Sequence, residues 1–292
     1  MKKFFVVIMI VIMTTVIGGC ANTKFEKYMF FDRYRTMRAE ENISKLTDQE
    51  TTVEMYGTVL PLFEEDSHVS ELFDEAKADI RAFYGGVDYF NWERFENSKL
   101  KQMKENAFTI EGFEGGANAA YLPNDNIVIV YSVIRSYPDR LAKETMAHEL
   151  IHALTENENT TTTNPAIYEG LTEILSAELY RAEIQGYAIS CNFVSMYMRV
   201  AGAEEAVKNI LNGEVIEDVN SKTKPGAMED VSKSILALDM GYGKEEDYLL
   251  YVDLIANYAI NVGIIDEIAD AIKEIRWSDP QAKEYFAWLV QQ

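Results

Sequence analysis

Five consecutive residues of this chain form the pattern His-Glu-x-x-His: His148, Glu149, Leu150, Ile151 and His152. On a helix, residues four apart lie on the same face, because one turn takes about 3.6 residues. Both imidazoles can then reach one metal ion, and the carboxylate between them lies where a general base is needed. The pattern therefore predicts a zinc site with its own base.

This prediction requires that the surrounding chain is helical. Ser136 is a candidate N-cap, Pro138 and Asp139 suit a first turn, and good helix formers continue to Leu154. The neighbours of the two histidines are apolar, which predicts a helix that is buried on nearly all sides. Buried histidines and a buried glutamate need partners, and a divalent cation can satisfy all three. The alternative is a pair of core histidines satisfied by hydrogen bonds.

A catalytic zinc usually has three protein ligands and one open position, so the two histidines need a third partner. A second helix is expected after a polar loop, because Pro165 suits a first helical position. Glu169 and Glu173 lie four residues apart and would project from one face of that helix. Gly170 would let it approach the helix of the histidines closely. From the residues alone, either glutamate could complete the site.

The motif and the segment 168–173, Tyr-Glu-Gly-Leu-Thr-Glu, together resemble the gluzincins, the thermolysin-like zinc metallopeptidases. The resemblance covers residues 136–180. It implies one Zn²⁺ per chain and a peptide or protein substrate. By this resemblance the three zinc ligands are His148, His152 and Glu169. The resemblance also implies that Glu149 is the catalytic base and that Glu173 is an outer-shell acid that orients a ligand histidine.

Amide hydrolysis also needs a donor for the oxyanion that develops on the carbonyl oxygen. His68 is the remaining one of the three histidines, and the chain has 17 tyrosines. We expect the donor in the C-terminal part of the chain, around Tyr187, Tyr197 and Tyr242. The sequence does not single out one of them.

The start of the chain predicts export. Lys2 and Lys3 precede an apolar run, and small residues lead up to Cys20, as in a secretory signal. The apolar run is shorter than the ~20 residues that usually span a membrane. The segment resembles a bacterial lipobox, which implies cleavage before Cys20 and a lipid on its thiol. We therefore expect a lipid-anchored protein on the extracytoplasmic face of the cell membrane.

The charge and the cysteines agree with that expectation. The formal net charge is −21, so binding to nucleic acid or to an anionic membrane surface by charge is not expected. The chain has two cysteines. With Cys20 lipidated, Cys191 has no partner for an intrachain disulfide. The hydrophobic core must then hold the fold together.

The predicted fold class is α+β: a zincin-like catalytic region with a small antiparallel sheet, then a predominantly helical C-terminal lobe. A helix is expected over 67–84 from its apolar spacing, and strands are expected in three places. The strands are 107–113 and a hairpin of 117–122 with 127–133. In gluzincins an edge strand pairs with the substrate backbone, and this hairpin could supply it.

The expected domain organisation has four parts. These are a signal peptide at 1–20, a tether at 21–50, the catalytic region at 51–180 and the helical lobe at 181–292. Helix-breaking Gly and Pro residues separate the helices expected in that lobe. They are 203–211, 227–240, 245–260, 264–275 and 280–290.

Three functions are compatible with these features. The first is an extracytoplasmic zinc peptidase, and the second is a surface-binding lipoprotein that keeps the scaffold without turnover. The third is a zinc hydrolase of a non-peptide amide, such as a cell-wall component. The intact Glu149 favours the first and third, because a non-catalytic scaffold does not need a base.

Overall fold

The computed structural model describes residues 52–55, 58–61, 63–104, 118–157, 159–160, 165–182, 184, 186–239 and 243–266. The described parts confirm the α+β class, with a small sheet, then the helix of the histidine pair, then a mostly helical region. Several predictions fall outside these residues and stay predictions. They are the signal peptide, the lipid on Cys20, the tether, the strand at 107–113, Tyr242, most of the helix at 264–275 and the helix at 280–290.

The chain divides into two compact units. One comprises the described parts of Met1–Tyr84 and Glu93–Ala153, and the other those of Gly85–Trp92 and Leu154–Gln292. The first unit contains the strands, and the second consists largely of helices. Within the described residues, we find no helix with both the length and the apolar character needed to cross a bilayer.

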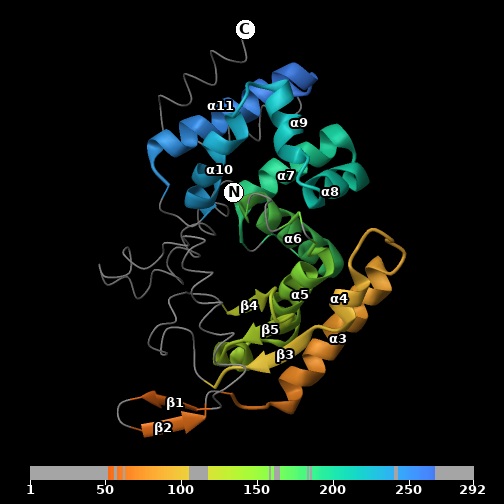
Figure 1. Ribbon diagram of the computed structural model, residues 1–292, viewed down its shortest axis with the longest axis vertical. Helices are drawn as coiled ribbons and strands as arrows, with labels where there is room; N and C mark the ends of the chain where they lie inside the picture. The colour runs from red at the N-terminus through yellow and green to blue at the C-terminus, as the bar shows by residue number, and fades with distance from the viewer. Residues whose placement is uncertain are drawn as a thin grey trace, which may run out of the picture. The chain divides into compact units, whose positions relative to one another are not determined.

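A three-stranded sheet lies in the first unit, with the order β3-β5-β4 (Figure 1). Strands β4 (Ala119–Leu122) and β5 (Ile127–Val130) form the predicted antiparallel hairpin. All four residues of β5 are buried, as its β-branched composition requires of a central strand. Strand β3 (Lys99–Gln102) pairs parallel with β5, which makes the sheet mixed. This strand was not predicted, because its sequence, Lys-Leu-Lys-Gln, is polar.

A second hairpin precedes the sheet. Strands β1 (Thr52–Met55) and β2 (Thr58–Pro61) pair antiparallel. Helix α3 (Ser67–Tyr84) then occupies the range that its apolar spacing predicts, and it buries Val69, Leu72, Phe73, Ala76 and Ile80. The short helix α4 (Trp92–Glu96) follows and buries Phe95.

Charged side chains of α3 contact the helix that carries the motif, α5 (Asp139–Thr155). Lys143 Nζ lies 3.2 Å from Glu75 and 3.3 Å from Asp79. His68, at the start of α3, lies 2.9 Å from Asp139. The two helices are therefore joined both near the start of α5 and about one turn further along it.

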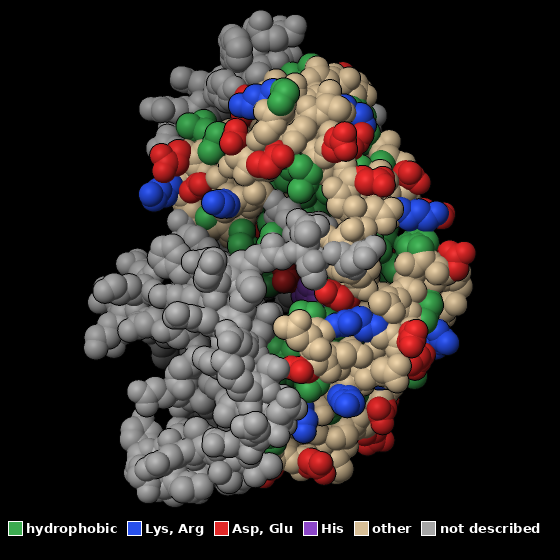
Figure 2. All heavy atoms as spheres, in the orientation of Figure 1, with side chains coloured by type: hydrophobic (Ala, Val, Ile, Leu, Met, Phe, Trp, Pro, Cys, Tyr) green, Lys and Arg blue, Asp and Glu red, His purple; other side chains and the backbone are tan. Residues whose placement is uncertain are grey.

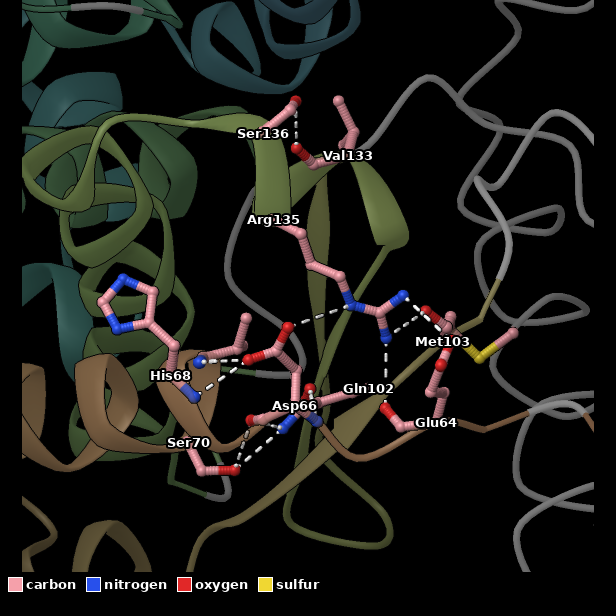
Figure 3. A network of polar contacts seen from close by, with 10 residues as sticks. Glu64, Asp66, His68, Ser70, Gln102, Met103, Val133, Arg135 and Ser136 are labelled. Atoms are coloured by element: carbon pink, nitrogen blue, oxygen red, sulfur yellow. Dashed lines mark hydrogen bonds and ion pairs between the residues drawn. The ribbon is translucent and has the colours of Figure 1, made fainter.

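Arg135 joins the entry of α3 to the segment that leads into α5 (Figure 3). It lies on the 3-10 helix η3 (Ser132–Ser136). Its guanidinium donates to the backbone oxygens of Glu64 at 3.1 Å and Met103 at 3.4 Å, and pairs with the Glu64 carboxylate at 3.3 Å. Asp66 caps α3 by accepting from the backbone of His68. The end of β3, the start of α3 and η3 are thus held by one network.

The second unit contains six described helices. They are α6 (Pro165–Tyr180), α7 (Ala188–Ala201), α8 (Ala203–Leu211), α9 (Val215–Lys222), α10 (Ala227–Asp239) and α11 (Glu245–Val262). Helices α8, α10 and α11 match the predicted ranges to within two residues, and α6 begins at Pro165 as predicted. Their core includes the fully buried side chains of Phe193, Tyr197, Tyr251 and Tyr258.

Helix α7 was not predicted, because its N-terminal cap comes from a distant residue. Its N-cap position is Tyr187, which has a left-handed backbone and no side-chain cap. The carboxylate of Asp239, at the end of α10, accepts instead from the backbone of Ile189 at 2.7 Å and of Ser190 at 3.0 Å, and also from the Ser190 hydroxyl. Orphan N–H groups in a first turn need such acceptors. No local sequence signal marks this one.

Gly170 of α6 permits close packing against α7. A Cβ built on Gly170 would lie 2.6 Å from the carbonyl carbon of Ser190 and 2.8 Å from its oxygen. The sequence analysis expected this glycine to serve an approach to the helix of the histidines, and in that respect it was wrong. The neighbour that comes nearest to it is α7, not the helix of the histidines.

Candidate metal centre

Helix α5 presents the motif as predicted, although it begins later than expected. Its first residue is Asp139, and the Ser136 hydroxyl donates to the Val133 carbonyl inside η3 instead of capping α5. Around the histidines the helix is buried on nearly all sides. Residues with no exposed surface are Met146, Ala147, Leu150, Ile151, Ala153 and Leu154. His152 is only 7% exposed, while His148 and Glu149 are half-buried.

Three donor groups come together at the motif. His148, His152 and Glu169 each offer one ligand atom, and these atoms all lie within 4.8 Å of one another. The two imidazole rings have centroids 5.0 Å apart and an interplanar angle of 77°. Of the two glutamates that the sequence left as candidates, Glu169 is the one that joins the histidines in this group.

The donor set suits zinc. Imidazole nitrogen and carboxylate oxygen are ordinary zinc donors, and two histidines with one glutamate leave a tetrahedral position open. With bonds of about 2.0–2.1 Å, ligand atoms of such a site stand roughly 3.3 Å apart. The observed spacing of up to 4.8 Å lies within reach of that value through side-chain rotation. A cation would also offset the cost of holding His152 and a carboxylate away from water.

Tyr131 lies near the proposed base and was missed by the sequence reasoning. Burial and the negative charge of Glu149 raise the pKa of its phenol to about 12, so the hydroxyl remains a donor at neutral pH. Its side chain is 5% exposed. Tyr131 directly follows the buried strand β5 and lies shortly before the motif helix in the sequence. This position is a signal by which the residue could have been predicted. The sequence analysis expects the donor among the C-terminal tyrosines instead.

Glu173 is half-buried on α6, one turn after Glu169. Its Oε1 accepts from the backbone N–H of Gly186 at 3.0 Å. Its negative charge also contributes to the raised pKa of the Cys191 thiol, for which burial is the main cause. The assignment of Glu173 as the acid that orients a ligand histidine stays a prediction.

The other candidates for an oxyanion donor have different surroundings. His68 contacts Asp139, the first residue of α5, which is nine residues and about 14 Å of helix away from His148. Tyr197 is fully buried, and its hydroxyl accepts from the Asn209 amide at 3.0 Å. His68 is therefore too far along α5 to donate to a substrate at the motif, whereas the assignment of Tyr197 stays a prediction. Tyr187 occupies the N-cap position of α7.

Comparison with known proteins adds no family assignment: no family model matches the chain, and neither does any curated protein or solved structure. The likeness to gluzincins therefore rests on the motif residues and on the His-His-Glu donor group, which resembles an HExxH…E site.

Proposed function

We propose that the protein is a zinc-dependent peptidase, held at the extracytoplasmic face of the cell membrane by a lipid on Cys20. One observation carries the catalytic part of this proposal. The ligand atoms of His148, His152 and Glu169 lie within 4.8 Å of one another, and Glu149 is adjacent to the first of them on the same helix. The membrane anchor is supported only by the lipobox-like residues that end at Cys20.

His148, His152 and Glu169 would hold the ion. Bound zinc lowers the pKa of water and polarises a carbonyl group, which supplies a nucleophile and an electrophile at neutral pH. Glu149 then acts as the general base, taking a proton from the attacking water and returning it to the leaving amine. Glu149 is half-buried, which suits this role, because a general base needs some access to the attacking water.

We expect an extended peptide substrate to pair with the sheet of the first unit. Among the described strands, β4 lies at one end of the order β3-β5-β4, so the proposal has the substrate pair along β4. A substrate added to this edge would gain main-chain hydrogen bonds with little dependence on sequence. The acidic net charge of −21 would favour basic peptides. On the face shown in Figure 2, acidic side chains are spread over the described surface instead of forming one patch.

The first test is the zinc content of the purified chain starting after Cys20, measured by elemental mass spectrometry. We expect one zinc per chain and cleavage of a peptide library. Glu149→Gln should keep the zinc and lose the cleavage, whereas Glu178→Gln, on the exposed surface of α6, should change neither. A chain that cannot be loaded with zinc would disprove the proposal.

The ligand assignment has its own test. Glu169→Ala should abolish zinc retention, because it removes one of three ligands. Glu173→Ala should weaken zinc binding by about 10–100-fold, as the loss of an outer-shell partner does. The reverse order would exchange the roles of the two residues. Zinc binding with cleavage of only non-peptide amides would favour the alternative hydrolase.

The anchor is tested separately. Expression of the full chain in a bacterium with radiolabelled palmitate should label the wild type and leave Cys20→Ser unlabelled. Equal labelling of both would exclude lipidation of Cys20 without affecting the zinc site.

A further inference from the structure

A partly buried hydrogen bond lies one turn beyond the histidine pair. The hydroxyls of Thr155, the last residue of α5, and Tyr168 of α6 are 2.8 Å apart. Thr155 is 2% exposed and Tyr168 is half-buried, so this contact is partly shielded from water. Tyr168 directly precedes Glu169, the carboxylate of the donor group.

The spacing along α5 relates this bond to the ligands. His148, His152 and Thr155 follow one another at intervals of four and three residues, so they lie along one face of the helix. The face that presents the two imidazoles therefore also presents the Thr155 hydroxyl. On α6, the hydroxyl that it meets belongs to the residue next to the third ligand.

Both partners are themselves held in place. Asn91 donates from its backbone to the Leu154 carbonyl at 2.7 Å and from its side-chain amide to the Glu156 carbonyl at 3.0 Å. The end of α5 is thus fixed on either side of Thr155. On α6, the hydroxyl of Thr172 donates to the Tyr168 carbonyl at 3.0 Å. A hydrogen bond between two anchored points transmits a displacement of one helix to the other.

We propose that Thr155 and Tyr168 are positioning residues, whose hydrogen bond sets the distance of Glu169 from His148 and His152. This inference rests on the zinc site proposed above. Two ligands share one helix, whereas the third follows a polar connection after it, so the site is complete only when α5 and α6 keep a fixed separation. A separation fixed before the ion binds removes part of the ordering cost of binding.

The test uses Tyr168→Phe and Thr155→Val, which remove one hydroxyl each and keep the shape of the side chain. Zinc affinity is measured by competition with a chelator, and cobalt is substituted to record the visible absorption of the site. Each variant should bind zinc about 2- to 10-fold more weakly, as expected for the loss of one hydrogen bond. The double variant should lose less affinity than the sum of the two single losses, because both substitutions remove the same bond.

Two further variants separate positioning from general stability. Thr155→Ser restores the hydroxyl and should recover the zinc affinity and the cobalt spectrum of the wild type. Thr145→Val is the matched control, because the Thr145 hydroxyl donates only within α5, to the Leu141 carbonyl at 2.9 Å. It should leave both readouts unchanged. If Thr155→Val fails to fold, Tyr168→Phe with the cobalt spectrum still decides the question.

The outcomes distinguish this inference from the proposed function. A wild type that binds one zinc, with Tyr168→Phe and Thr155→Val of equal affinity and an unchanged cobalt spectrum, would overturn the positioning role alone. If the two variants had lower melting temperatures but the zinc affinity of the wild type, the bond would stabilise the fold without positioning Glu169, and the positioning role would again be overturned. A wild type that retains no zinc would overturn both the inference and the zinc site on which it rests.

Discussion

Replacing Gly170 by Ala should destabilise the helical unit, although alanine is the better helix former. An added Cβ would lie 2.6 Å from the carbonyl carbon of Ser190 and 2.8 Å from its oxygen. Ordinary contacts of a Cβ begin near 3.4 Å, so α6 and α7 would have to separate by about 0.8 Å. The two backbone atoms cannot rotate away, and the cap from Asp239 holds the Ser190 N–H in place.

The size of the effect follows from two opposing terms. Overpacking of this kind costs about 1–3 kcal/mol, and contact with rigid backbone favours the upper end of that range. The higher helix propensity of alanine stabilises the folded state by about 1 kcal/mol relative to glycine. The net loss should be about 2 kcal/mol, which lowers the melting temperature by roughly 4–8 °C for a unit of this size.

Urea and thermal denaturation followed by circular dichroism would measure the change, with zinc affinity as a second readout, because Glu169 adjoins the displaced residue. Gly86→Ala is the matched control: its added Cβ meets nothing within 4 Å, so we expect a neutral or slightly stabilising effect. If Gly170→Ala were as stable as Gly86→Ala, the close α6–α7 contact would not exist in solution.

Three further outcomes are expected. Burial raises the pKa of Asp239 from 3.8 to about 6, so the folded state binds the extra proton and stability falls as pH rises from about 4 to about 6. Asp239→Asn should remove up to about 3 kcal/mol of that pH dependence in urea denaturation of the zinc-free protein. The hydrogen bond to Asp139 raises the pKa of His68, so whatever stability this exposed pair contributes is present below about pH 6.5 and is lost above the raised pKa. His68→Gln should therefore change the melting temperature slightly at pH 5, change it less at pH 8, and leave zinc content intact. Tyr131→Phe should also keep one zinc per chain but lower kcat/KM by about 10- to 100-fold. This is the loss expected when a hydrogen bond to a charged group is removed, and steady-state peptide cleavage would measure it.

The elements nearest the motif were predictable because their signals are local. The apolar spacing of 67–84 predicted α3 to the residue, and Pro165 marked the first position of α6. The hairpin of β4 and β5 followed from β-branched residues on one side of a polar turn. In that turn Asn126 has a φ of 54°, a conformation that asparagine tolerates better than most residues.

Elements that depend on distant partners were not predictable. Strand β3 has the sequence Lys-Leu-Lys-Gln and exists because β5 pairs with it. Helix α7 starts where Asp239, about 50 residues further along the chain, accepts its first N–H groups. The start of α5 was predicted too early, because η3 takes up Ser136. In each case a tertiary contact outweighs local preference.

The sequence by itself determined the chemistry available to this protein. Two histidines at a helical spacing, a glutamate between them and apolar neighbours on all sides define a helix face that could bind a metal ion. Only the tertiary structure decided which acid joins them, because the choice between Glu169 and Glu173 depends on how α6 lies against its neighbours. It also revealed that the charge of Glu149 acts on Tyr131 and that Thr155 and Tyr168 share a hydrogen bond, since both depend on packing that no local spacing encodes.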